Sequence, residues 1–242
     1  MESEVKEIKT LTREVAEKYF KARFSVDLAT FHYIEDEAAK IISKKENSCG
    51  LQLDGLCELS EKSAGFLARH VDSISLNGLP KISDSVALML AKCKGHALHL
   101  NGLTSLSESV ALALGKYRGG LSLNGLNEIT ESQAKNLAKT RKESIGFLFL
   151  GGLKTITDEV ALALSKHKNG CLDLGSLLSL SDKACDSLVK IKGGLSFSSL
   201  AECSDMALDR LGAFADSGNS LYLSPLYSQR LKDHKSSPTV RR

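Results

Sequence analysis

The sequence lacks any run of about 18 apolar residues, the length that a membrane-spanning helix requires. Its first 15 residues, MESEVKEIKTLTREV, also lack the apolar segment of a secretory signal. The 242 residues are 42% hydrophobic and 25% charged, which is typical of a soluble protein with a sizeable core. We therefore expect a cytoplasmic protein without a membrane span.

The short motifs that mark catalytic sites are also missing. The six histidines form no H-E-x-x-H motif, and the sequence contains no G-x-S-x-G turn. His96 and His99 lie near one expected strand, but two histidines without a third ligand do not make a metal site. The glycine-rich stretch GGLSLNG at 119–125 precedes a strand, whereas a phosphate-binding loop follows one. We expect no enzymatic activity, no cofactor and no bound metal.

The cysteines show no spacing typical of zinc sites. No pair is arranged as C-x-x-C, and several cysteines occupy positions where other parts of the sequence have Ala, Ser or Leu. We interpret them as reduced, packed thiols of a cytoplasmic protein. They are Cys49, Cys57, Cys93, Cys171, Cys185 and Cys203.

The body of the chain has little net charge. The total of +3 comes from residues 227–242, which hold five Lys or Arg and one Asp, while the first 226 residues hold 27 basic and 28 acidic residues. This excludes a strongly basic nucleic-acid-binding domain. We interpret residues 227–242 as a basic, flexible C-terminal tail, which is either a solvated end or an anion-binding arm.

A near-identical hexapeptide recurs along the chain: ISLNGL at 74–79, LHLNGL at 98–103 and LSLNGL at 121–126. Extending it gives nine copies of one unit, spaced by 23 to 27 residues. Self-similarity at such a period predicts a solenoid of about nine β-α units. The first strand residues of the copies are Val26, Leu51, Ile74, Leu98, Leu121, Leu148, Leu172, Leu195 and Leu221.

Each unit has a strand half and a helix half. The Leu-x-Leu pattern points both leucines to one face of a short strand, and Asn-Gly then predicts a chain reversal. Four residues after the next leucine, a Ser or Thr followed by an acid predicts a helix start, and apolar residues follow at +3, +4, +7 and +8. The expected N-cap residues are Ser83, Ser107, Thr130, Thr157, Ser181 and Ser204.

The two ends of the array differ from the middle. Thr12 starts the same helical pattern, so residues 1–25 are predicted to form a capping helix. The unit at Val26 is degenerate but keeps its apolar positions, and residues 26–226 form the predicted solenoid.

The pattern L-x-L-x-G-L-x-x-I-[ST]-[DE] over about residues 8–226 resembles the leucine-rich repeat superfamily, and most resembles its cysteine-containing and ribonuclease-inhibitor-like subclasses. The resemblance implies a curved α/β solenoid with a parallel sheet on the concave face, helices on the convex face and a role in binding other proteins. The position that usually holds the family's Asn or Cys ladder is Leu here, so we expect no hydrogen-bonded side-chain ladder. These leucines are Leu79, Leu103, Leu126, Leu153, Leu177 and Leu200.

If the strand leucines face inward, the concave surface is mostly small and polar. Phe147 and Phe149 are the exception, and we expect them to anchor a protein or peptide partner. The alternative is that the connection 139–146 covers them and makes a local core. The other expected partner-binding residues are Asp173, Ser122, Asn124, His99, Asn101 and Tyr222.

Basic residues recur in phase where the expected helices end, with acids in phase at the helix starts. Dipole complementation and solubility explain this arrangement, and binding of a polyanion such as nucleic acid is the alternative. A third possibility is a structural or regulatory spacer in a larger assembly. We expect a monomer. The basic pairs are Lys92/Lys94, Lys116/Arg118, Lys139/Arg141, Lys166/Lys168 and Lys190/Lys192.

Overall fold

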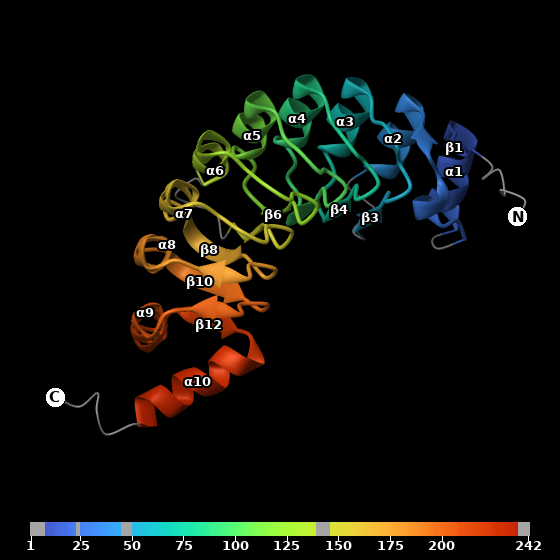
Figure 1. Cartoon of the computed structure of the whole chain (residues 1–242). Coiled ribbons are helices and arrows are strands. Elements are labelled where there is room, and N and C mark those ends of the chain that lie inside the picture. Colours follow the sequence, from blue (N-terminus) through green and yellow to red (C-terminus); the bar gives the residue numbers. More distant parts are fainter. Residues whose placement is uncertain (1–7, 23–24, 45–49, 139–145, 237–242) are drawn as a thin grey trace, which may run out of the picture.

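The computed structural model of the chain describes residues 8–22, 25–44, 50–138 and 146–236 (Figure 1). Short strands and helices follow one another through these residues, with two strands between α7 and α8 and two between α8 and α9. The helices are α1 Arg13–Lys21, α2 Asp36–Ile42, α3 Glu61–Leu67, α4 Asp84–Leu90, α5 Glu108–Leu114, α6 Glu131–Leu137, α7 Asp158–Leu164, α8 Asp182–Leu188, α9 Asp205–Asp216 and α10 Pro225–Ser236. The strands are β1 Thr10–Leu11, β2 Tyr33–Ile34, β3 Leu51–Gln52, β4 Ile74–Ser75, β5 Ala97–His99, β6 Gly120–Ser122, β7 Leu148–Phe149, β8 Lys168–Asp173, β9 Ser179–Leu180, β10 Lys192–Phe197, β11 Glu202–Cys203 and β12 Ser220–Leu223.

Eight strands form one parallel sheet in the order β12-β10-β8-β7-β6-β5-β4-β3. The residues paired across it are the first strand residues that the repeat predicts, from Leu51 opposite Ile74 to Leu195 opposite Leu221. The predicted register is therefore confirmed from Leu51 onward. Figure 1 shows an arch whose inner side is lined by the sheet and whose outer side is covered by helices α1 to α9.

The first of the nine predicted strands, at Val26, does not join this sheet. Residues Leu28–Thr30 form a short 3-10 helix, and the Asp27 side chain accepts a hydrogen bond from the Ala29 N–H at 3.0 Å. The chain becomes extended only at β2, which pairs with β1 in a separate two-stranded sheet. The expectation of nine strand units was wrong here, because a local side-chain bond at Asp27 favours a turn over an extended strand.

The core runs the length of the array between the sheet and the helices. From β3 to β10 both apolar residues of each strand motif are buried, as in Leu98 and Leu100, which have no exposed surface, whereas Leu221 and Leu223 of β12 are partly buried. The Val, Ala and Leu stripe of each helix is buried opposite them, as in Ala111 and Leu114. Buried apolar area of this extent is the main term that stabilises a repeat array.

Helices α4 to α9 begin where the sequence predicts. Each Ser or Thr cap accepts a hydrogen bond from the backbone N–H three residues later, at 3.0–3.2 Å. The acid after the cap also joins two units: Asp84 accepts from the Ser107 hydroxyl at 3.1 Å, and Asp158 accepts from the Ser181 hydroxyl at 2.5 Å. These carboxylates therefore link neighbouring helices in addition to complementing the helix dipole.

The glycine of the Asn-Gly turns is needed for packing between units rather than for its backbone angles. Within the described residues only Gly193 and Gly218 have the positive φ that glycine favours. At Gly102 a Cβ would lie 2.2 Å from the carbonyl oxygen of Asn77 in the preceding unit. The glycine thus permits close approach of successive backbones.

Both ends of the array are covered by helices. At the N-terminal end, Ala16 and Tyr19 of α1 are buried against the core. At the other end, residues 225–236 form α10, and Tyr227 is only 3% exposed. Its hydroxyl accepts a hydrogen bond from the Cys203 N–H at 3.0 Å and lies 3.1 Å from the carbonyl oxygen of Ala201. The prediction of a flexible tail from residue 227 was therefore wrong as far as Ser236, because this phenol ties the helix to the preceding unit. Residues 237–242 lie outside the described residues.

Candidate partner-binding surface

The register of the sheet brings the predicted concave residues into two rows. One row follows pairs from Ser122 through Phe149, Asp173 and Ser196 to Tyr222. The second row includes Cys171 and Gly194, which pair directly across β8 and β10. These positions alternate with the buried leucines, so their side chains point to the inner side of the arch.

Phe147 and Phe149 lie together on this inner surface. Their ring centroids are 6.0 Å apart and the rings are inclined by 18°, a stacked arrangement. Phe147 is 43% exposed, and Phe149 is half-buried. The prediction that both phenylalanines point away from the leucine core is therefore confirmed. The alternative of coverage by the connection concerns residues 139–145, which lie outside the described residues.

Small neighbours surround the pair. A Cβ at Gly120 would lie 3.6 Å from the Cβ of Phe147, so glycine leaves open the strand position beside it. On the other side Cys171 lies opposite Gly194, where a Cβ would be 3.1 Å from the cysteine sulfur. The sequence already indicates that the inner surface around the phenylalanines consists of small residues, and Gly120 is one of them. The signal for these glycines is their place in the repeat, one residue before the first strand leucine.

Asp173 lies beside Phe149 in the same row and is half-buried. Its carboxylate oxygens are turned toward the backbone at Gly151 and Gly175, where an added Cβ would lie 3.2 Å from them. Within the described residues, this carboxylate forms no hydrogen bond and no ion pair. We call Phe147, Phe149 and Asp173 together the phenylalanine site.

Three other predicted contact residues belong to a hydrogen-bonded ladder. The side-chain oxygen of Asn77 accepts from the Asn101 N–H at 2.9 Å, Asn101 accepts from the Asn124 N–H at 2.9 Å, and Asn124 accepts from the Gly151 N–H at 2.7 Å. Ser122 is 4% exposed and donates to the Asn101 side chain at 2.7 Å. The expectation of no side-chain ladder was wrong.

The ladder has consequences for the predicted site. The side-chain oxygen of Asn101 is used within the fold, where it accepts from the Ser122 hydroxyl and the Asn124 N–H. Ser122 is buried and was wrongly expected to be exposed. Asn124 remains exposed although its oxygen is used. His99 is half-exposed on β5, and Tyr222 is 62% exposed on β12, three strands from Phe149.

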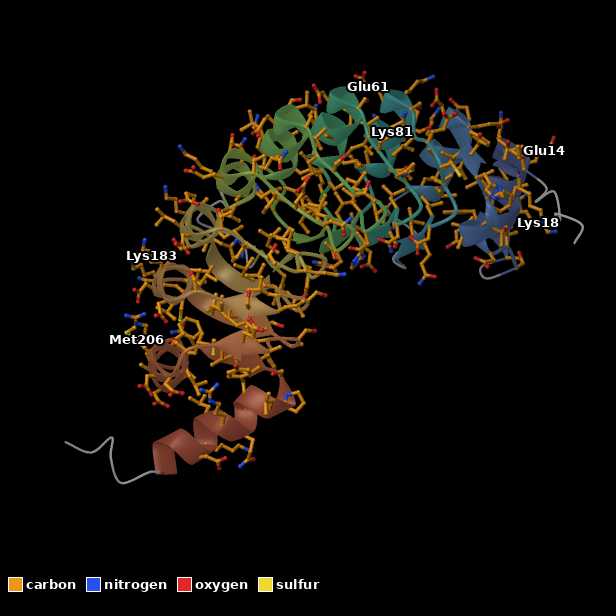
Figure 2. The ribbon with its side chains drawn as sticks, in the orientation of Figure 1. Glu14, Lys18, Glu61, Lys81, Lys183 and Met206 are labelled. Atoms are coloured by element: carbon orange, nitrogen blue, oxygen red, sulfur yellow. The ribbon has the colours of Figure 1, made fainter. Side chains whose placement is uncertain are left out.

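The outer side of the arch carries charges and some exposed apolar groups. Figure 2 shows Glu61, Lys183 and Met206 on the helical side, away from the sheet. Three leucines five residues after a helix cap are also exposed there, and the sequence prediction missed them because they fall outside the buried helical stripe: Leu88, Leu112 and Leu162.

The predicted basic ridge is exposed where the structure describes it. Lys139 and Arg141 lie outside the described residues. The exposed members are Lys92, Lys94, Lys116, Arg118, Lys166, Lys190 and Lys192. Some acids at the opposite ends of the helices accept hydrogen bonds from the cap hydroxyls of the next unit. The Thr130 hydroxyl, for example, donates to a carboxylate oxygen of Glu108 at 2.9 Å.

The side chains that could bind a metal or act as nucleophiles do not cluster within the described residues. Among the described residues, no group of three or more His, Cys, Asp and Glu side chains is arranged to hold a metal ion. Burial raises the pKa of the Cys93 and Cys185 thiols to about 12, so both stay protonated and act as packing groups.

No protein-family model matches the chain, and no curated protein matches it with significant similarity. In the described part of the chain, every helix is too short or too polar to cross a lipid bilayer.

Proposed function

We propose that the chain is a leucine-rich repeat protein that serves as a non-enzymatic scaffold and binds a protein or peptide on the inner face of its sheet. The repeating β-α unit, the parallel sheet inside the arch and the helices outside support the family assignment. The proposal includes a cytoplasmic, monomeric protein.

The phenylalanine site carries the functional proposal. An aromatic pair on an otherwise small and polar surface gains free energy when a partner removes it from water. Aromatic side chains near the centre of an interface contribute most of the binding energy in many complexes. Phe149 belongs to β7, which lies between β6 and β8, so a partner that covers the pair would also contact the neighbouring strands.

A second candidate function is binding of a polyanion along the basic ridge. The in-phase exposure of Lys92, Lys116 and Lys190 favours it. Phosphate contacts release counterions, so this mode weakens steeply with salt, whereas an aromatic anchor responds little. A structural or regulatory spacer in a larger assembly is the third possibility.

Affinity capture from the native source, with the bound proteins identified by mass spectrometry, tests the proposal. We expect a partner that is captured by the wild type, retained when salt is raised, and lost by the Phe147→Ala Phe149→Ala variant. A matched ridge variant, Lys92→Gln Lys116→Gln Lys190→Gln, should still capture it. Capture that depends on the ridge and not on the phenylalanines would support polyanion binding instead.

A further inference from the structure

The carboxylate of Asp173 differs from the other half-buried acids of the array within the described residues. Asp54 accepts hydrogen bonds from the Ser75 hydroxyl at 2.5 Å and the Asn77 N–H at 2.9 Å. Asp186 forms an ion pair with Arg210 at 2.8 Å. Asp173, in contrast, is half-buried and forms neither interaction within the described residues. A carboxylate on the inner face without a partner in the chain is available to an incoming hydrogen-bond donor.

The row of inner-face residues that contains Asp173 holds no Lys or Arg from β6 to β12. Its members are Ser122, Phe149, Asp173, Ser196 and Tyr222. The nearest basic side chain along this row is that of His99, three strands from Asp173, or roughly 14 Å at the usual strand spacing. Burial raises the pKa of the Cys171 thiol, and the negative charge of Asp173 raises it further.

The aromatic neighbour of Asp173 defines the shape of the missing group. Phe149 lies directly opposite it on the adjacent strand, about 4.8 Å away at the usual spacing. A planar cation can therefore lie over the exposed phenylalanine rings while its N–H groups reach the carboxylate. Arginine fits this arrangement best, since its guanidinium stacks on aromatic rings and forms paired hydrogen bonds with a carboxylate.

We propose that the phenylalanine site binds an arginine side chain of the partner, with the guanidinium against Phe147 and Phe149 and paired to Asp173. This inference rests on the proposed function and adds the chemistry of the partner to it. The side-chain stem of the arginine covers the rings, and the charge of the carboxylate selects against an acidic residue at the same place.

A displayed library of random peptides, selected on the wild-type chain, tests this chemistry. We expect the enriched peptides to share an arginine. One such synthetic peptide should bind Asp173→Asn about tenfold or more weakly, and Ser196→Ala, the next residue in the row, as well as the wild type. Replacing the peptide arginine with lysine should also weaken binding, because an ammonium cannot form the paired bonds.

The outcomes separate the two levels of the proposal. Peptides that need Phe147 and Phe149 but show no arginine preference, or that bind Asp173→Asn and the lysine peptide unchanged, would overturn the arginine assignment and leave the proposed function standing. Peptides that bind the Phe147→Ala Phe149→Ala variant as tightly as the wild type, or no enrichment at all, would overturn both. Equal melting temperatures of Asp173→Asn and wild type would show that a loss of binding is not a loss of folding.

Discussion

The side-chain oxygen of Asn101 accepts a hydrogen bond from the backbone N–H of Asn124, one unit further along the array, at 2.9 Å. The same oxygen accepts from the Ser122 hydroxyl at 2.7 Å. One amide therefore satisfies two donors of the next unit, and the equivalent bonds at Asn77 and Asn124 repeat the connection along the sheet.

Asn101→Ala should lower the free energy of unfolding by about 1–3 kcal/mol, because the buried Ser122 hydroxyl and the Asn124 N–H lose their acceptor. Urea denaturation followed by circular dichroism measures this. Asn101→Asp, which keeps an acceptor oxygen, should cost less. His99→Ala in the same unit should be nearly neutral, and an equal loss at both positions would remove the ladder's role in stability.

Gly102→Ala should destabilise the protein by more than about 2 kcal/mol, since the new Cβ would lie 2.2 Å from the Asn77 carbonyl oxygen. Gly65 is the matched control: it lies within α3, and the nearest atom to a Cβ there is the Met89 sulfur at 3.7 Å. Gly65→Ala should stabilise the helix by about 0.5–1 kcal/mol. Opposite signs in thermal melting are expected; a tolerated Gly102→Ala would contradict the close approach of successive units.

Because of His167, the free energy of unfolding should decrease as pH is lowered. Burial lowers its pKa, although the hydrogen bond between its Nε2 and the Gly146 carbonyl oxygen at 2.9 Å acts the other way. The unfolded chain, with an ordinary histidine pKa of about 6.5, therefore binds the proton more readily than the folded chain. This contribution is fully present above that pKa and is lost as pH falls from it toward the lower folded value.

A neutral donor at the same place should remove this part of the pH dependence. His167→Gln keeps an N–H that can donate to the Gly146 oxygen. In the preceding unit the neutral Tyr117 hydroxyl donates to the Gly95 carbonyl oxygen at 2.8 Å. Melting temperatures measured from pH 7.5 to 5 should fall less steeply for His167→Gln than for the wild type. Parallel pH profiles would show that His167 does not titrate differently in the folded state.

The exposed phenylalanines should matter little for folding. Phe147→Ala with Phe149→Ala removes a stacked pair that is partly in water, so we expect a loss of about 1 kcal/mol. Leu148→Ala, between them in sequence and 2% exposed, should cost about 2–5 kcal/mol. Thermal or urea unfolding compares the three proteins directly. A loss for the double variant as large as that for Leu148→Ala would show that the rings are core.

The register and the helix starts were predictable because each depends on a strong local pattern. Alternating leucines set which residues of a strand face inward, and a hydroxyl followed by an acid favours a helix N-terminus wherever it occurs. The burial of Leu98 and the cap bond of Ser107 follow from these patterns alone.

The features that the sequence did not predict depend on contacts between units, which a local pattern does not show. Asn101 looked like a turn residue, but its side chain reaches Asn124, 23 residues away. Tyr227 looked like part of a tail, but its phenol bonds to the unit containing Cys203. The phenylalanine site was found because Phe147 and Phe149 interrupt a repeat of small residues, whereas the unpaired state of Asp173 becomes visible only in three dimensions.

The affinity of the captured partner for the Phe147→Ala Phe149→Ala variant is the most direct test of the central claim, that the phenylalanine site anchors a partner on the inner face. Isothermal titration calorimetry at one fixed salt concentration compares it with the wild type. We predict a Kd raised by well over tenfold, as expected for the loss of an aromatic hot spot. An unchanged Kd, with both proteins folded, would contradict the account and move the binding surface elsewhere on the array.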